Sequence, residues 1–322
     1  MFELMKGIRS IFEACMAVKP GEQWLVLADD DGRSMWIGQL VMNVISSMGS
    51  EAVLVIITPR EIAEQEPPAS VAAAMRSVDA VVRVSEKKAL VHSDARKEAT
   101  AAGVRYYSIM GGIPIEDLKQ GVSAADIQLI KEKTESLAQR LTQASVARVT
   151  SQLGTNITLG LTGREGIALH PMSHVAAGLP YYAEAAIAPV EGTAEGIIVA
   201  DLAVVQWGYR LREPLRITVK AGKVVDISSC AQEADRLRKI IAMDENASNI
   251  AELGIGTSHI IPWEIHGTRR DAARIGTAHI GIGRNNDIGG KTWSRIHVDS
   301  LIDKAIVDLD DYCVLREGSL LI

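Results

Sequence analysis

Short apolar runs alternate with helical segments through roughly the first 120 residues, and this alternation limits the fold more than any other feature. Between the runs lie helical patterns: one opened by Ser34, one near 68–76 and one at 92–102. Strands that are apolar on both faces, each followed by a helix, are typical of a parallel sheet covered on both sides. We therefore predict a small doubly wound α/β domain, with strands at 23–27, 52–57, 79–84 and 104–108.

The pattern changes at Val146, where apolar and polar residues begin to alternate with Gly at the turns (VARVTSQLGTNITLGLTG). This period of two is typical of antiparallel strands. A long helix opened by Ser123 connects the two parts, and a chain of 322 residues exceeds the size at which single cores stop growing. We predict an α/β domain at 1–145 and a mostly antiparallel, β-rich α+β domain at 146–322.

Composition excludes several classes of protein. The net charge is −6 and the basic runs are short, which argues against nucleic acid as a partner. The three cysteines are far apart, so we expect neither a disulfide framework nor a cysteine-rich zinc site, and a reducing cytoplasm fits. No apolar run approaches the roughly 20 residues that a membrane span needs. The first strand is not followed by the G-x-G-x-x-G of dinucleotide-binding folds.

One stretch in the second half, Gly276 to Asp299, carries metal-ligand chemistry. His297 and Asp299 are two residues apart, so in a strand both side chains project from the same face. An imidazole and a carboxylate that converge are suited to a divalent metal. An H-x-D pair also arises by chance, and the hexapeptides IGTSHI and IGTAHI leave open whether His259 or His279 joins it.

Two acidic residues on apolar backgrounds are further candidates, Glu184 in YYAEAAIAP and Glu252 in NIAELGIG. A lone buried carboxylate is costly without a cation or hydrogen-bond donors. Either residue could instead be exposed or lie at a helix N-terminus.

The segments YYAEAAIAPVEGTAEG, NIAELGIG, GTAHIGIG and IHVD resemble those of the thermophilic metalloaminopeptidases, such as aminopeptidases T and S. This resemblance implies a dimer and a C-terminal domain with two divalent ions of Zn, Co or Mn. The ligands that it implies are Glu184, Glu252, His279, His297 and Asp299. One departure is that the metal-site Tyr of that family falls here on Asn286.

The same segments also resemble 2,5-dihydroxypyridine 5,6-dioxygenase, an enzyme of the same superfamily with one iron(II) held by two His and one carboxylate. His297 and Asp299 match its H-x-D motif, and its GGK turn is echoed at 289–291. Its remaining His aligns with Glu252. Glu184 and His279 stand where the dioxygenase has apolar residues.

From these features we expect a metal-dependent hydrolase that cleaves an amide or peptide bond in a small molecule or short peptide, through a metal-activated water. Glu191, His170 and His174 are candidates for proton transfer or substrate contact. The alternative is an iron(II) dioxygenase that opens a hydroxylated pyridine or similar N-heterocycle. A non-catalytic protein with a structural ion is a third possibility. We also expect a cytoplasmic homodimer.

Overall fold

The computed structural model describes residues 1–60, 65–86, 90, 93–110, 113–172, 181–205, 207–229 and 232–322. The chain divides into two compact units, one of Met1–Leu129 with His170–Pro180 and one of Ile130–Leu169 with Tyr181–Ile322. This division falls inside the long helix α6 (Ala124–Gln143), and the predicted boundary at residue 145 lies just after the end of that helix.

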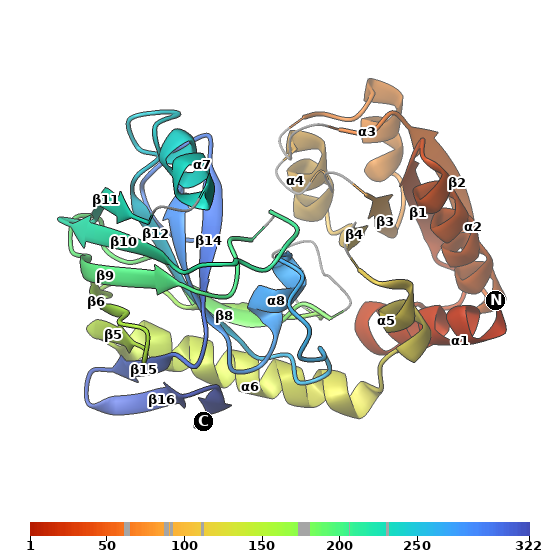
Figure 1. The fold of residues 1–322 in the computed structure, drawn as a ribbon. Coiled ribbons are helices and arrows are strands. Elements are labelled where there is room, and N and C mark those ends of the chain that lie inside the picture. The colour runs from red at the N-terminus through yellow and green to blue at the C-terminus, as the bar shows by residue number, and fades with distance from the viewer. Residues whose placement is uncertain are drawn as a thin grey trace. The chain divides into compact units, whose positions relative to one another are not determined.

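The first unit is built on a four-stranded sheet in the order β2-β1-β3-β4, in which all neighbours are parallel (Figure 1). Its strands are β1 (Gln23–Asp29), β2 (Glu51–Ile57), β3 (Ala80–Ser85) and β4 (Arg105–Met110). Its helices are α1 (Phe2–Ile11), the π-helical η1 (Phe12–Met16), α2 (Gly32–Ser47), α3 (Ala69–Met75), α4 (Asp94–Ala101) and α5 (Ile115–Gln120). The prediction of a parallel sheet in this part of the chain is confirmed.

Successive residues of a strand point to opposite faces of the sheet, and the residues of β1 and β3 are buried on both faces. Helices therefore cover both faces of this sheet. Leu25, Leu27 and Val81 form one apolar cluster with residues of α3 and α4, among them Met75 and Ala99. On the other face α2 approaches the sheet closely. A Cβ added at Gly38 of α2 would lie 3.1 Å from the Cβ of Ala28 in β1.

The start of α2 differs from the prediction that Ser34 opens it. The helix begins at Gly32, and Asp31 is the N-cap, accepting hydrogen bonds from the backbone N–H of Arg33 (3.1 Å) and Ser34 (2.8 Å). Asp is among the residues most favoured at the N-cap. Because Asp31 comes three residues before Ser34 and takes the N-cap position, Ser34 lies inside the first turn of the helix.

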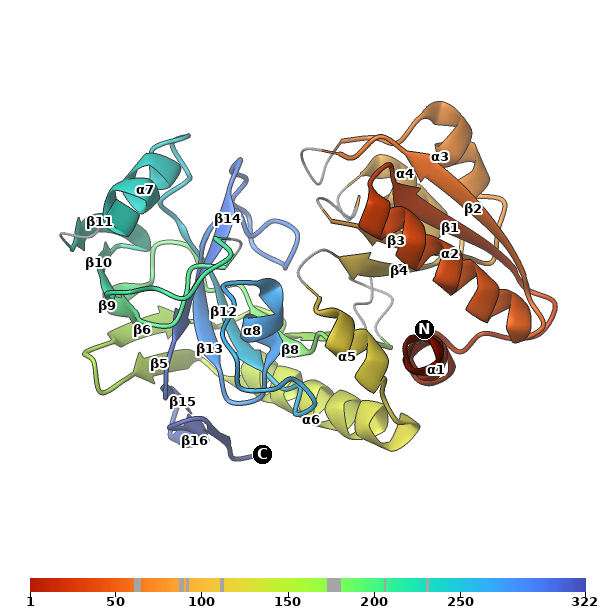
Figure 2. The same ribbon diagram turned by 45° about the vertical axis from the view of Figure 1, so that its right-hand side comes forward.

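The second unit holds two sheets in which all pairs are antiparallel. One has eight strands in the order β11-β10-β9-β6-β5-β15-β16-β17, and the other has five in the order β14-β13-β12-β8-β7 (Figures 1 and 2). The bounds are β5 (Val146–Thr150), β6 (Asn156–Gly160), β7 (Ile167–Leu169), β8 (Glu184–Ile187), β9 (Glu195–Ala200), β10 (Leu215–Lys220), β11 (Lys223–Ser228), α7 (Gln232–Ile241), β12 (Ile250–Gly256), α8 (Arg269–Ala273), β13 (Ala278–Gly283), β14 (His297–Ile302), β15 (Ile306–Leu309), β16 (Tyr312–Arg316) and β17 (Ser319–Leu320).

Apolar side chains of both sheets and of α6 and α7 form one core cluster, including Leu137, Ile157, Ile198, Leu237 and Ile280. An α/β unit with a parallel sheet therefore accompanies a β-rich unit with antiparallel sheets, and the predicted fold class is confirmed.

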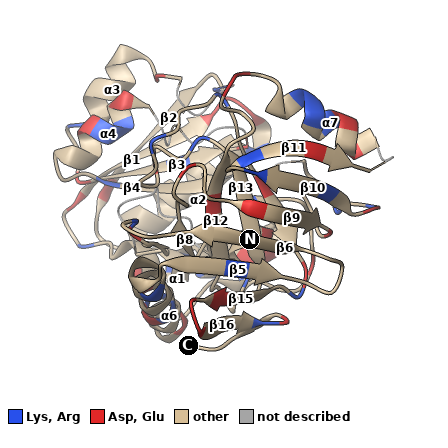
Figure 3. Cartoon of the chain, turned by 90° about the vertical axis from the view of Figure 1, so that its left-hand side faces the viewer, with Lys and Arg blue, Asp and Glu red and all other residues tan. Residues whose placement is uncertain are grey.

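Charged residues of both signs are interspersed on the elements in view in Figure 3, and helices such as α4 and α7 carry both. Among the described helices, none is long and apolar enough to cross a membrane.

Candidate metal centre

The five-stranded sheet of the second unit has one apolar face and one face that carries acids and imidazoles. Leu253 of β12, Ile280 and Ile282 of β13 and their neighbours point into the core cluster. Because side chains alternate along a strand, the residues between them lie on the opposite face. Those residues include the five predicted ligands, Glu184 of β8, Glu252 of β12, His279 of β13, and His297 and Asp299 of β14.

The strand register brings these side chains together around glycines. Gly281 of β13 is paired with Glu252 on one side and Asp299 on the other, and Gly254 of β12 is paired with His279. A Cβ at Gly254 would lie 2.2 Å from the Cε1 and Nε2 atoms of His279, and one at Gly281 would lie 2.7 Å from the Cβ of Glu252. Glycine at these two positions therefore leaves the space that the ring and the carboxylate occupy.

The five side chains form two groups that share Glu252. In the first group, His279 Nε2 lies 3.6 Å from Glu184 Oε2 and 3.8 Å from Glu252 Oε1. In the second group, His297 Nε2 lies 3.0 Å from both Glu252 Oε2 and Asp299 Oδ1. Glu252 thus directs one oxygen toward each imidazole.

Burial and mutual charge shift the pKa of every member. Burial raises the pKa of Glu184 to about 7, against the opposing effect of His279. Burial also works to raise the pKa of Glu252, but the imidazoles of His279 and His297, of which His297 lies at hydrogen-bond distance, outweigh it and hold that pKa well below the usual range. The pKa of Asp299 is lowered in the same way, mainly by the charge of His297.

Both imidazoles hold their protons more tightly than an isolated histidine does. Burial lowers the pKa of a histidine, but the carboxylates raise that of His279 to about 9 and that of His297 well above its usual value. For His279 the charge of Glu184 is the largest opposing cause, and for His297 it is the charge of Asp299. A bound cation would replace these protons, since metal ligands are deprotonated.

The side chains of this cluster are suited to binding a divalent cation. Glu184 Oε2 and His279 Nδ1 are buried and make no hydrogen bond, which is costly unless another group satisfies them. The Nδ1 of His297 lies 2.8 Å from the carbonyl oxygen of Arg284. If that nitrogen donates its proton there, Nε2 is left as the atom that can bind a metal, the usual role of such an outer partner. Carboxylate oxygens and imidazole nitrogens are suitable donors for iron(II), manganese(II) or zinc(II).

A sequence model of one enzyme family, described as 2,5-dihydroxypyridine 5,6-dioxygenase (NicX), matches residues 3–322. The chain belongs to the 2,5-dihydroxypyridine 5,6-dioxygenase family. Because members of this family are enzymes, we conclude that the chain is an enzyme. The described groups of residues that could hold a metal lie in its second unit. A search of curated protein sequences found no match.

Two solved structures share the fold over nearly the whole chain. The 2,5-dihydroxypyridine dioxygenase of Pseudomonas putida KT2440 is 18% identical, has a TM-score of 0.80, and the match covers 99% of this chain and 96% of that one. Wild-type AmpT of Thermus thermophilus is 15% identical, has a TM-score of 0.66, and the match covers 100% and 99%. At this level of identity the likeness concerns the fold.

The expectation of an aminopeptidase-type hydrolase is wrong. The family match spans the chain and names a dioxygenase, and the dioxygenase structure superposes with the higher TM-score of the two. The error has a physical source: the short segments around Glu184, Glu252 and His279 describe a metal-binding sheet face, and a sheet face of this kind does not fix the reaction.

The other predicted residues lie elsewhere or outside the described residues. Glu191 lies after β8 and contacts Arg164, Asn285 and Lys291 rather than the carboxylates and imidazoles above. His170 is buried and falls among the residues assigned to the first unit. His174 lies outside the described residues. The side chain of Asn286 is exposed.

Of the two echoed histidines, His279 belongs to one of the described groups of residues that could hold an ion, and His259 belongs to neither of them. One neighbour escaped the sequence analysis. The hydroxyl of Tyr182 hydrogen-bonds to Glu184, and the charge of Arg269 acts on that hydroxyl. The sequence places Tyr182 two residues before Glu184, but outside β8, which begins at Glu184.

Proposed function

We propose that this chain is an iron(II)-dependent dioxygenase that opens the ring of a hydroxylated pyridine or a similar N-heterocycle. The observation that carries the proposal is the match of residues 3–322 to the 2,5-dihydroxypyridine 5,6-dioxygenase family. The buried group of carboxylates and imidazoles supports it, because a redox-active metal can activate dioxygen for ring cleavage and this group is suited to one.

The group that contains the H-x-D motif is our proposed iron site. Glu252, His297 and Asp299 would hold the ion through two carboxylates and one imidazole, and the carbonyl of Arg284 would keep His297 Nε2 directed at it. When bound, iron(II) would supply the activation of dioxygen. In the overall reaction one ring carbon–carbon bond breaks and both atoms of O₂ join the two carbons, so that no other oxidant or reductant is needed.

Glu184 and His279 would then handle the proton of the substrate hydroxyl. Burial raises the pKa of Glu184, which favours its protonated form, and its Oε2 makes no hydrogen bond, so this carboxyl group is suited to proton transfer. His279 Nε2 lies 3.6 Å from that oxygen and can share the proton. Tyr182 holds the carboxylate through its hydroxyl. All five side chains are at least largely buried, which keeps bulk water from competing with the substrate.

The test is oxygen uptake by protein purified without air and loaded with iron(II), using a panel of dihydroxypyridines. We expect uptake with at least one of them and ring loss in the ultraviolet spectrum. His297→Ala should abolish both uptake and iron binding, whereas His279→Gln should retain about one iron per chain but react slowly.

Glu66→Ala serves as the control, since Glu66 accepts the backbone N–H groups of Asp94 and Ala95 within the first unit. Iron-loaded protein that takes up no oxygen with any member of the panel would contradict the proposal.

A further inference from the structure

The connection between β13 and β14 carries the acceptor for His297, and side chains from other segments hold that connection in place. It begins at Arg284, whose carbonyl lies 2.8 Å from His297 Nδ1. The Arg284 N–H donates to the carbonyl of Ile296 (2.9 Å), so the first and last residues of the connection are bonded to each other. Whatever fixes this connection therefore fixes the carbonyl that orients the imidazole.

The next residue, Asn285, is the centre of the connection and is fully buried. Its backbone N–H donates to the carbonyl of Thr292 (3.0 Å), and its side-chain oxygen accepts the N–H of Thr292 (2.8 Å). Its own carbonyl accepts the N–H groups of Ile288 (3.1 Å) and Gly290 (2.9 Å). Hydrogen bonds to Asn285 therefore hold the two sides of this loop together.

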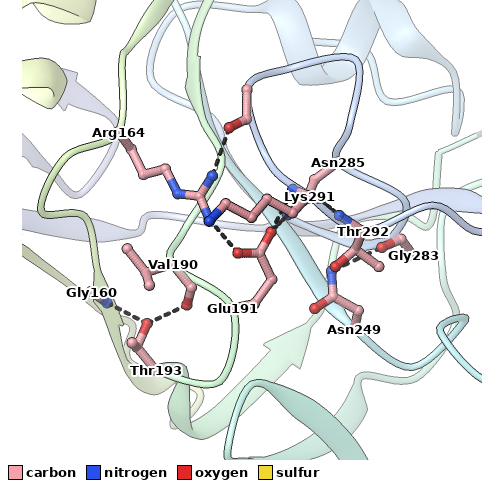
Figure 4. A network of polar contacts seen from close by, with 11 residues as sticks. Gly160, Arg164, Val190, Glu191, Thr193, Asn249, Gly283, Asn285, Lys291 and Thr292 are labelled. Atoms are coloured by element: carbon pink, nitrogen blue, oxygen red, sulfur yellow. Dashed lines mark hydrogen bonds and ion pairs between the residues drawn. The ribbon is translucent and has the colours of Figure 1, made fainter.

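Glu191, from the segment between β8 and β9, reaches this centre (Figure 4). Its Oε1 accepts both the side-chain N–H of Asn285 (3.1 Å) and the backbone N–H of Lys291 (2.8 Å). Its Oε2 pairs with Arg164, which also donates to the carbonyl of Gly289 (2.6 Å). The Arg164 side chain is only 10% exposed, and such a partly buried, charge-assisted contact is stronger than a surface ion pair.

The far end of the connection is held separately. Asp244 Oδ2 accepts the Ser294 hydroxyl and the Arg295 N–H, both at 2.8 Å. Arg284 is thus held from both sides, through its N–H to Ile296 near the end held by Asp244 and through Asn285 to Glu191. Glu191 and Arg164 are the contacts that act on the Asn285 side.

We propose that Glu191 is a positioning residue of the metal centre, which acts through Asn285 and the Arg284 carbonyl to hold the imidazole of His297 in its binding orientation. The inference rests on the proposed metal site and gives Glu191 a role other than direct proton transfer. Outer partners of metal-binding histidines typically alter metal affinity by about 10–100-fold when they are replaced.

The experiment measures two properties of Glu191→Ala. The first is the solvent exchange of the His297 Nδ1–H proton in the metal-free protein, followed by NMR and assigned by its loss in His297→Ala. The second is the affinity for manganese(II), measured by titration. We expect faster exchange and a manganese affinity lower by about tenfold or more. Glu191→Gln should restore most of both, because its amide oxygen can still accept from Asn285 and Lys291.

Matched variants separate positioning from general destabilisation. Glu66→Ala removes a carboxylate that also accepts two N–H groups, and it should leave both readouts unchanged. Arg164→Met should change them in the same direction as Glu191→Ala but less, and it keeps the inference testable if Glu191→Ala does not fold. Wild-type exchange and affinity in Glu191→Ala, or equal losses in Glu66→Ala, would overturn the inference. Neither readout uses the ring-cleavage reaction, so a failure of the proposed function would be seen separately in the oxygen assay.

Discussion

At the scale of single residues, Gly254 shows how closely the site is packed. We predict that Gly254→Ala displaces the ring of His279, because the added Cβ would lie 2.2 Å from two of its atoms. Overpacking of this kind typically costs about 1–3 kcal/mol. Urea unfolding of the metal-free protein measures the loss. Gly32→Ala is the control, since a Cβ there meets no atom within 4 Å. Equal stability of the two variants would show that the ring is free to move.

A second prediction for single residues concerns how the stability of the metal-free protein depends on pH. The folded-state pKa of His279 is raised to about 9, so its contribution to stability is complete below its usual value of 6.5 and is lost as the pH rises through about 9. The pKa of Glu184, raised from 4.5 to about 7, acts in the same direction, but its contribution is lost earlier, as the pH rises through about 7. We expect thermal stability to fall between pH 7 and pH 10 while manganese(II) affinity increases, because the cation replaces protons on the imidazoles. Stability that rises over this range would contradict the charge assignment.

The sequence could predict part of this site. Strand alternation placed His297 and Asp299 on one face, and the apolar surroundings of Glu184 and Glu252 marked them as unusual. It could not choose between His259 and His279, because the choice depends on which strand is paired with Gly254. The roles of Tyr182 and of the Arg284 carbonyl depend on contacts that sequence spacing does not determine.

At the scale of elements, the cap of α2 offers a direct test. Asp31 accepts two N–H groups of the first turn, and loss of such a cap costs about 1 kcal/mol. We predict that Asp31→Ala lowers the melting temperature and that Asp30→Ala, the exposed neighbour, does not. Calorimetry of the two variants decides the matter. If both melt alike, the helix does not depend on this cap.

The elements themselves were largely predictable, because buried parallel strands read as continuous apolar runs and half-buried antiparallel strands as alternation. What was not predictable is pairing over long sequence separations. β15 pairs with β5, and Ile306 lies opposite Thr150, so this interior pair of the eight-stranded sheet joins the end of the chain to its middle. The β-bulge at Ala251, between Ile250 and Glu252, also has no sequence signature.

At the scale of the whole molecule, the sequence segments narrowed the family to two related kinds of enzyme. The hydrolysis predicted from them was the wrong reaction of the two. The segments around the five side chains resemble those of two related enzymes, and only the pattern over residues 3–322 favours the dioxygenase. A homodimer stays a prediction, and light scattering would measure it.

In the reaction that we propose, this chain adds both atoms of dioxygen across a ring bond. Mass spectrometry of the product formed under ¹⁸O₂ tests it most directly, with iron(II)-loaded protein and the dihydroxypyridine that supports oxygen uptake. We expect a ring-opened product that carries two labelled oxygen atoms, and no such product from His297→Ala. A product labelled only when H₂¹⁸O replaces ¹⁸O₂ would rule out this reaction, because both new oxygens would then have come from water.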